Sequence, residues 1–377
     1  MSLFRSEKSM NHKGSYTFFV TNMGGGGTER TISNLLRGFS SDECAVDLVL
    51  LQATGPYLDD LPPNVSVFTL NRRSRLFALL PLVKYFRKRR PSFFISFFTR
   101  NNLLAIVARR IARVPSRLIV NERQNLKGWL AQEPFWRRLH YRLLIRLLYP
   151  RADRLFTNSR GVAEDLARFL PELSSKIRFV PNGVLTPDFQ EKTAEPIPRS
   201  DLFRNDRPVI LAVGRLYGIK DFPTMIHAFA RIRREQTATL VILGDGPRRR
   251  ELEELVRNLR LENDVCFLGF VRNPFNYMAR ARLVVISSLI EASPNVLIEA
   301  LACGTPVVST DCDYGPRELL KDRRFGTLVP VRDHRTLAQA ILERLRAAPE
   351  RVDAGDALRC YGFEEATKRF REALLEA

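Results

Sequence analysis

Two glutamates in the second half of the chain have types and a spacing suited to carbohydrate chemistry. Glu299 follows Glu291 by eight positions within residues 287–302. Ser293 and Pro294 favour a helix start, so we expect Glu291 on the loop before a helix and Glu299 two turns inside it. A carboxylate accepts hydrogen bonds from sugar hydroxyls, so each glutamate is a candidate for one sugar ring. Two solvated helix glutamates are the alternative interpretation.

The start of this helix is a candidate phosphate site. The first backbone N–H groups of a helix lack intrahelical partners and carry partial positive charge. We therefore expect the unpaired N–H groups of Asn295, Val296 and Leu297, next to Ser293, to face an anion. The layout predicts a phosphate here, the transferred sugar on the loop glutamate and a ribose on the helix glutamate.

Two cations follow the first strand expected in this half of the chain. The apolar run 209–213 predicts a buried strand and leads into Gly214 and Arg215, with Lys220 five residues further on. Arginine offers forked donors and lysine a point charge, so the pair is able to bind a diphosphate from two directions. The alternative is two surface cations beside a turn.

Two glycine loops also follow expected strands. Gly244 and Asp245 come after 239–243, and Gly26 and Gly27 come after the first strand of the chain. Glycine permits tight turns and close approach of a ligand, although an ordinary strand-to-helix turn has the same composition. The G-x-G-x-x-G spacing of a dinucleotide loop is absent, which disfavours a nicotinamide enzyme.

These residues require a scaffold of alternating strands and helices. The length of 377 residues and the alternation of strands and helices predict two α/β domains with parallel sheets. The proline-rich stretch 186–207 is the expected linker, which gives domains 1–185 and 186–360 and a final helix, 361–377. Strands are expected at 16–21, 45–51, 65–70, 93–98, 118–121, 154–158 and 176–180, then at 209–213, 239–243, 265–268, 283–286, 306–309 and 327–329.

The run E-A-S-P-N-V-L-I-E-A-L-A-C-G-T-P-V-V resembles the signature of the large retaining, family 4-like glycosyltransferases, whose hallmark is two glutamates separated by seven residues. V-P-N-G-V, V-G-R-L…K-D-F and L-G-D-G-P match the same family in the same order. The resemblance implies the GT-B fold, two Rossmann-like domains facing across a cleft. It also implies a final helix that crosses back to the first domain.

The resemblance further implies roles for the residues singled out above. Arg215 and Lys220 would bind the donor diphosphate, Glu299 the ribose and Glu291 the donor sugar, with Glu291, Arg215 and Lys220 as the catalytic set. Gly214, Gly244 and Asp245 would line the donor site, and the loop of Gly26 and Gly27 would cover the phosphate. The expected donor is a UDP-sugar. No metal cluster is visible in the sequence, and no cofactor is expected.

The first half departs from many family members at one strand end. Where they carry a histidine, the strand 93–98 is followed by T-R-N-N, and Asn121-Glu122-Arg123 follows the next strand. Both motifs are similar to those of bacterial relatives that build lipid-linked oligosaccharides. This resemblance implies Arg100, Asn101, Glu122 and Arg123 on the acceptor side, and structural salt bridging is the alternative.

The charge is strongly and unevenly basic. Lys and Arg number 60 against 41 Asp and Glu, a net charge of +19, and residues 61–121 contain no acid. The segments 82–90 and 134–149 combine cations with aromatic and aliphatic residues, which favours an anionic membrane surface over a core helix with a solvated arginine face. No apolar run reaches the roughly 20 residues of a spanning helix, so we expect a cytoplasmic protein docked on the inner face of the plasma membrane.

Three functions are compatible with these features. The first is retaining transfer of a hexose or N-acetylhexosamine from a UDP-sugar to a membrane-associated saccharide, as in glycan, O-antigen or lipopolysaccharide biosynthesis. The second is a nucleotide-sugar epimerase of the same architecture, which leaves the basic surface unexplained. The third is a basic nucleic-acid-binding protein. No nucleic-acid module is recognisable, so a nucleic-acid partner is not expected.

Overall fold

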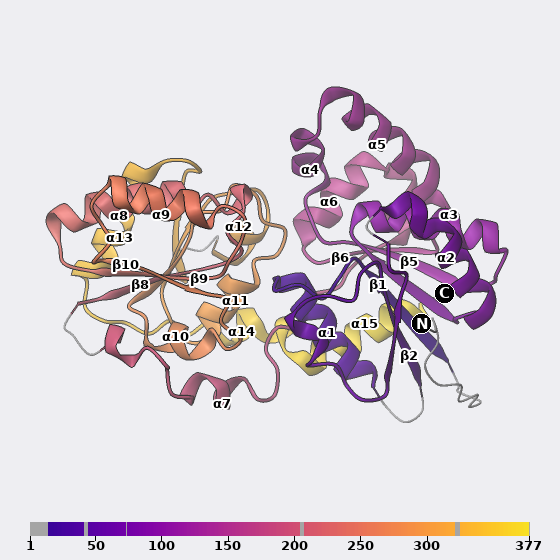
Figure 1. The fold of residues 1–377 in the computed structure, drawn as a ribbon, viewed down its shortest axis with the longest axis horizontal. Helices are drawn as coiled ribbons and strands as arrows, with labels where there is room; N and C mark the ends of the chain where they lie inside the picture. The colour runs from indigo at the N-terminus through magenta and orange to yellow at the C-terminus, as the bar shows by residue number, and fades with distance from the viewer. Residues whose placement is uncertain (1–13, 41–43, 73, 204–206, 321–324, 377) are drawn as a thin grey trace. The chain divides into compact units, whose positions relative to one another are not determined.

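The computed structural model describes residues 14–40, 44–72, 74–203, 207–320 and 325–376. They form two compact units (Figure 1). Unit 1 combines the chain up to Gly183 with the segment from Phe363 onward, and unit 2 is Val184–Gly362. The boundaries expected from the sequence, 185 and 360, each differ from these by two residues. Residues 1–13 and 377 of the expected domains lie outside the described residues.

Unit 1 is built on a seven-stranded parallel sheet with the order β3-β2-β1-β4-β5-β6-β7. The connections run outward from β1 to β3, and then return to β4 on the other side of β1. The strands are β1 (Ser15–Val20), β2 (Ala45–Leu50), β3 (Val65–Thr69), β4 (Phe93–Phe97), β5 (Arg117–Glu122), β6 (Arg154–Thr157) and β7 (Ile177–Phe179).

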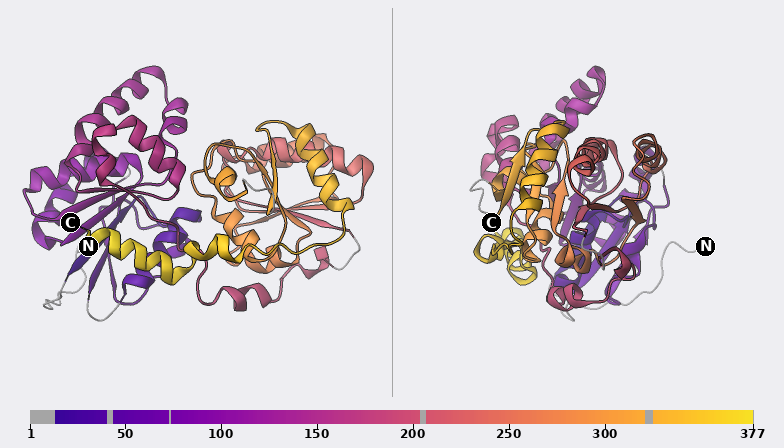
Figure 2. Two further views of the ribbon diagram at one scale, coloured as in Figure 1. Left: turned by 180° about the vertical axis from the view of Figure 1, so that it is seen from behind. Right: turned by 90° about the vertical axis from the view of Figure 1, so that its left-hand side faces the viewer.

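Both faces of this sheet are covered, because successive side chains of each strand point to opposite faces. Phe18 packs in a core with α1 (Gly27–Phe39) and α15 (Phe363–Leu375), where its ring lies 6.3 Å from that of Phe370. Figure 2 shows α15, in yellow, beside α1. The neighbouring residue Phe19 packs on the other face, against a core that includes α2 (Arg75–Arg89) and α3 (Thr99–Ala112).

Three further helices of unit 1 are α4 (Leu126–Gln132), α5 (Phe135–Leu148) and α6 (Arg160–Phe169). Ser159 caps the start of α6, since its hydroxyl accepts a hydrogen bond from the Val162 N–H at 3.2 Å. Helix α5 lies at the margin of unit 1 (Figures 1 and 2), and Ile145 is its one buried residue.

The expectation that 82–90 presents apolar residues to a membrane is wrong. This segment is the second half of α2, and its apolar side chains Leu82, Val83 and Phe86 are buried in the core. The exposed apolar residues of α2 are instead Leu76, Phe77 and Leu80 in its first half.

Unit 2 is built on a six-stranded parallel sheet with the order β10-β9-β8-β11-β12-β13. Its strands are β8 (Val209–Val213), β9 (Thr239–Leu243), β10 (Val265–Gly269), β11 (Leu283–Ile286), β12 (Val307–Thr310) and β13 (Gly326–Val329). Its helices are α7 (Phe189–Ala194), α8 (Phe222–Glu235), α9 (Arg249–Asn258), α10 (Phe275–Arg280), α11 (Asn295–Ala302), α12 (Gly315–Leu320), α13 (His334–Arg346) and α14 (Gly355–Leu358).

The stretch 186–207, expected to be a linker, is part of unit 2 and contains α7 and a short 3-10 helix at Ser200–Phe203, while its residues 204–206 lie outside the described chain. The prolines do not prevent this, because apolar side chains of this stretch pack in a core of unit 2. The ring of Phe189 lies 4.8 Å from that of Phe275, and Ile197 is buried in the same core.

Among the helices formed by the described residues, none is both long and apolar enough to cross a membrane.

Candidate functional site

The site in unit 2 lies where the connections of the sheet change direction. Strand β8 is central, β9 and β10 follow on one side, and β11 to β13 follow on the other. In open parallel sheets, ligands bind at the carboxyl ends of the strands at this point. The loops after β8 and β11 carry the two cations and Glu291.

Hydrogen bonds join these two loops. The Ser287 hydroxyl donates to the Lys220 carbonyl at 2.9 Å, and the Leu289 N–H donates to the Ile219 carbonyl at 2.8 Å. As a result the Lys220 ammonium forms a salt bridge with the Glu291 carboxylate. The structure therefore brings together two residues that are 71 positions apart in the chain.

Glu291 is held in place from further directions. The Ser288 hydroxyl donates to its Oε1 at 2.7 Å, and its backbone pairs with that of Tyr314 on the next loop. A Cβ on Gly315 would lie 2.3 Å from the Pro294 ring and 2.9 Å from the Ala292 carbonyl. Any larger residue at 315 would therefore displace the loop that carries Glu291.

Arg215 is exposed just beyond the end of β8, with its guanidinium 5.3 Å from the centroid of the Tyr217 ring. A cation over an aromatic face is attracted to it by about 0.5–1 kcal/mol at an exposed site. Tyr217, a residue that the sequence did not single out, therefore orients the predicted diphosphate ligand Arg215. Gly214 directly precedes it and donates its N–H to the Leu243 carbonyl at 2.9 Å.

The glycine loop after β9 is required for packing between loops. Gly244 has φ +138°, and a Cβ there would lie 1.9 Å from the Gly214 carbonyl oxygen. Asp245 accepts a hydrogen bond from the Gly246 N–H at 2.7 Å and pairs with Arg249 at 3.3 Å, so its carboxylate supports the turn into α9. These contacts explain the composition of the loop without a ligand.

The first turn of α11 differs from the expectation. The Leu297 N–H donates to the Pro294 carbonyl at 3.0 Å, which makes a tight turn at the start of the helix. The prediction that the Leu297 N–H is unpaired is therefore wrong. Asn295 is buried and Val296 is half-buried, as is Ser293 in the preceding loop. Glu299 is fully buried within the helix, whereas Glu291 remains partly accessible.

Unit 1 also carries polar side chains where its connections change direction, between β1 and β4. The side chains of Thr21 and Asn101 are 3.2 Å apart, and Arg75 donates to both, at 3.2 and 3.0 Å. Sequence reasoning missed Arg75, because nothing local signals that the start of α2 returns to the end of β1. Asn101 is completely buried and binds Arg75 rather than pointing to solvent.

Glu122, at the end of β5, lies in a buried network of neutral donors. It accepts hydrogen bonds from Thr99 at 2.9 Å, from Asn102 at 3.0 Å and from the Tyr149 hydroxyl. Burial raises the pKa of Glu122 to about 7, and the three hydrogen bonds limit that rise. Glu122 is 1 % exposed, so the structure places it in the core of unit 1.

Two other predicted acceptor-side residues are also engaged locally. Arg100 forms a salt bridge with Glu133, and its guanidinium lies 5.6 Å from the Trp129 ring centroid. Arg123 is buried with its guanidinium 5.8 Å from the Phe97 ring, and burial lowers its pKa to about 10. Helix α1 begins at Gly27, with Gly26 as its N-cap in an extended conformation.

In the described part of the chain, no three His, Cys, Asp or Glu side chains gather as a metal site. Asp311, which belongs to an Asp-x-Asp triplet, instead receives two hydrogen bonds of 2.8 Å from Arg317.

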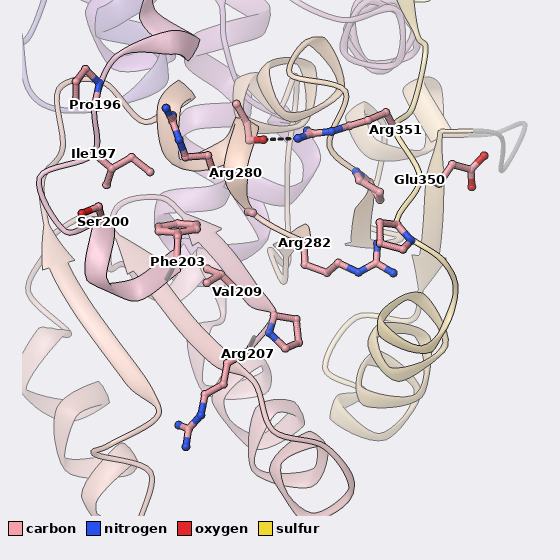
Figure 3. A pocket seen from close by; sticks show the side chains of 15 residues that line it. Pro196, Ile197, Ser200, Phe203, Arg207, Val209, Arg280, Arg282, Glu350 and Arg351 are labelled. Carbon is pink, nitrogen blue, oxygen red and sulfur yellow. Dashed lines mark hydrogen bonds between the residues drawn. The ribbon is translucent and has the colours of Figure 1, made fainter. Parts of the chain in front are cut away.

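Figure 3 shows a pocket of about 750 Å³ in unit 2, whose lining does not include Glu291. Its lining includes Val209 at the start of β8 and Arg282 just before β11, so it opens at the amino edge of the sheet. The Arg351 guanidinium donates to the Ala279 carbonyl at 2.6 Å, and Arg282 donates to the Arg344 carbonyl at 2.9 Å. These two cationic side chains of the pocket therefore join segments of its wall.

Two α/β units, each built on a parallel sheet with polar side chains at its carboxyl edge, define the GT-B class of glycosyltransferase fold. The crystal structure of HepE from Anabaena has this fold, and matches 97 % of this chain and 100 % of its own with a TM-score of 0.78 and 20 % identity. The glycosyltransferase WaaG matches with a TM-score of 0.70 and 18 % identity, over 96 % of this chain and 95 % of its own.

Sequence comparison gives the family. Residues 26–183 match the model described as glycosyl transferase 4-like domain, and residues 207–347 match glycosyl transferases group 1. A Campylobacter jejuni enzyme named as an N-acetylgalactosaminyltransferase acting on a diphospho-undecaprenol saccharide is 34 % identical, over 86 % of this chain and 88 % of its own. AmsD, an amylovoran biosynthesis glycosyltransferase of Erwinia amylovora, is 26 % identical over 79 % and 80 %. The chain therefore belongs to the glycosyltransferase family that these two models describe.

Proposed function

We propose that this chain transfers a hexose or N-acetylhexosamine from a UDP-sugar to a saccharide carried by a membrane lipid. The observation that carries the proposal is the salt bridge between Lys220 and Glu291 where the second sheet changes direction. In this proposal Arg215 and Lys220 bind the diphosphate, since fixed cations stabilise the charge of a leaving phosphate. Glu291 accepts hydrogen bonds from the sugar, and Glu299 from the ribose.

The proposed reaction retains the configuration at the anomeric carbon. The bond from that carbon to the diphosphate oxygen breaks, and the bond to the acceptor oxygen forms on the same face. The departing phosphate takes the proton of the acceptor hydroxyl, and no covalent intermediate with the chain is required. NMR of the product tests this step, since an inverted anomeric configuration would overturn it.

The choice of donor and acceptor is supported by relatives. HepE was crystallised in complex with UDP and glucose, and the Campylobacter enzyme is named for a lipid-diphosphate acceptor. A thermal-shift screen across UDP-, GDP- and ADP-sugars should give its largest stabilisation with a UDP-sugar. That donor is then incubated with polyprenyl-diphosphate saccharides. Conversion of the donor to an isomeric sugar without any acceptor would overturn transfer in favour of epimerisation.

The proposed acceptor lies in a membrane, and α5 is the proposed docking element at its inner face. Its large side chains Phe135, Trp136, Leu139, Leu143 and Leu147 are 52–78 % exposed. The same helix carries the cations of Arg142 and Arg146. Both guanidinium groups lie over the Phe169 ring, at 5.7 and 5.2 Å from its centroid. An amphipathic helix with a basic face binds anionic interfaces in this way.

Docking is tested by adding vesicles that contain phosphatidylglycerol. The double variant Leu139→Ser/Leu143→Ser should bind roughly tenfold or more weakly, because it removes exposed apolar area from the proposed contact. Unchanged binding would exclude α5 as the docking element.

A further inference from the structure

A second pocket, of about 550 Å³, lies in unit 1 at the amino edge of its sheet. It is formed by the end of α3, the loop that leads to β5, and the turn that leads to β6. Its only acid among the described lining residues is Asp153. The lining is Ile106, Arg109, Arg110, Arg113, Val114, Pro115, Ser116, Arg117, Arg151 and Asp153.

One of its five arginines holds the walls together. Arg109 donates to the Ser116 carbonyl at 3.0 Å, and contacts the Asp153 carboxylate and the Arg151 carbonyl. Asp153 also accepts a hydrogen bond from the Leu118 N–H at 2.7 Å. The acid and one cation are therefore used in fixing the shape of the pocket.

Three other arginines keep their guanidinium donors available. Arg110, Arg113 and Arg117 are exposed, and within the described chain their guanidinium groups form no hydrogen bond or salt bridge; Arg117 lies 5.9 Å from the Phe93 ring centroid. The end of α3 contributes a partial charge of roughly −0.5, which is small against three full positive charges. The pocket is therefore suited to an anion with several acceptor oxygens.

The pocket adjoins the exposed apolar residues of α5. The Arg151 guanidinium in its wall donates to the carbonyl of Leu147, the last large exposed residue of that helix. Ile111, next to Arg110 at the end of α3, is also exposed. A cationic pocket thus borders an apolar surface, which is the arrangement that an amphiphile with an anionic head requires.

We propose that this pocket binds the phosphate-bearing headgroup of an anionic phospholipid, while the adjacent residues of α5 contact the lipid chains. The inference rests on the proposed membrane docking. Charge complementarity and the bordering apolar surface favour a lipid over a free phosphate, which has no apolar part. The lining contains no aromatic residue on which bases would stack, which disfavours a single-stranded nucleic acid.

The test compares two triple variants that lose equal charge. Arg110→Gln/Arg113→Gln/Arg117→Gln removes the available cations of the pocket. Arg231→Gln/Arg250→Gln/Arg257→Gln removes three exposed arginines from α8 and α9 of unit 2. Sedimentation with vesicles is measured for phosphatidylcholine alone and for its mixture with phosphatidylglycerol. A cation near an anionic surface contributes about fivefold in binding, so the pocket variant should lose roughly 100-fold on mixed vesicles and the control less than about fivefold.

Equal losses in the two variants would overturn the proposal while leaving docking through α5 intact. Failure of the unmodified chain to bind mixed vesicles would overturn the docking itself. Binding of glycerol phosphate in solution as tightly as vesicles, or of single-stranded RNA through the same three arginines, would assign the pocket to another ligand. Sugar transfer to an acceptor in detergent, measured on the unmodified chain, tests the proposed reaction separately.

Discussion

Glu291 lies on the loop after β11 and Glu122 is the last residue of β5, so both are at the carboxyl edge of a parallel sheet, but their surroundings differ. Glu291 lies on a loop, partly accessible, and is paired with the cation of Lys220. Glu122 is 1 % exposed and receives hydrogen bonds from three neutral groups. A carboxylate that is charged, paired and accessible is available to a substrate. One that is buried among neutral donors joins segments of the fold.

The largest expected effect is on transfer when Glu291 is changed. Glu291→Gln removes the charge that pairs with Lys220, and should lower kcat roughly 1,000-fold, the upper end of the range for loss of a charge-stabilising group. Steady-state transfer assays measure this. Glu254→Gln on the exposed face of α9 is the matched control and should retain activity. Near-normal turnover in Glu291→Gln would mean that Glu291, like Glu122, has no direct part in transfer.

Glu122→Ala should act on stability instead. It leaves the Tyr149 hydroxyl, Thr99 and Asn102 without their buried acceptor, and should lower the free energy of unfolding of unit 1 by about 4 kcal/mol. Both tryptophans of the chain, Trp129 and Trp136, are in unit 1, so their fluorescence during urea unfolding reports this unit. A stable variant that fails to bind the acceptor would instead favour a direct acceptor role.

The stability of unit 1 should also depend on pH through Glu122. Its pKa is about 7 in the folded chain, against 4.5 ordinarily, so between these values the folded state holds a proton that the unfolded state has released. Stability therefore falls as pH rises from 4.5 to 7, by up to about 3 kcal/mol for a difference of 2.5 units. Glu122→Gln should lose this part of the pH dependence. An identical pH profile in the variant and the unmodified chain would contradict the assignment.

Lys220→Gln should have the smallest of these effects. It removes one charged hydrogen-bond donor from the proposed diphosphate site, which costs about 2 kcal/mol, or roughly 30-fold in the Kd for the UDP-sugar. Calorimetry with the donor alone measures it. Lys368→Gln on α15, whose ammonium is 4.0 Å from Glu372 at the surface, is the control. Equal affinities would mean that Lys220 positions Glu291 without binding the diphosphate.

The strands of the second half were predictable to the residue where they are short, continuous apolar runs. The bounds 209–213, 239–243 and 283–286 agree with β8, β9 and β11, because strands buried on both faces have no polar interruption. The orientation of α2 was not predictable in this way. Its basic and apolar residues alternate around the helix, and only packing against the sheet decides that Leu82 and Phe86 face inward.

The site was predictable in its residue types and less so in its contacts. Local sequence indicated Glu291 and Lys220 separately as donor ligands, but their pairing depends on hydrogen bonds between two loops. The burial of Glu122 and Asn101, and the approach of Arg75 to Thr21, arise from the order of strands in the sheet. Sequence spacing contains no information on these long-range neighbours.

The position of α15 has a consequence for how the chain is made. Its residue Phe370 packs with Phe18 and Phe156, although residues 184–362 form a separate unit in between. Unit 1 therefore remains incomplete on the ribosome until the whole of unit 2 has been synthesised. During that interval the aromatic surface that α15 will cover is open to solvent, which makes the nascent chain a candidate for chaperone protection.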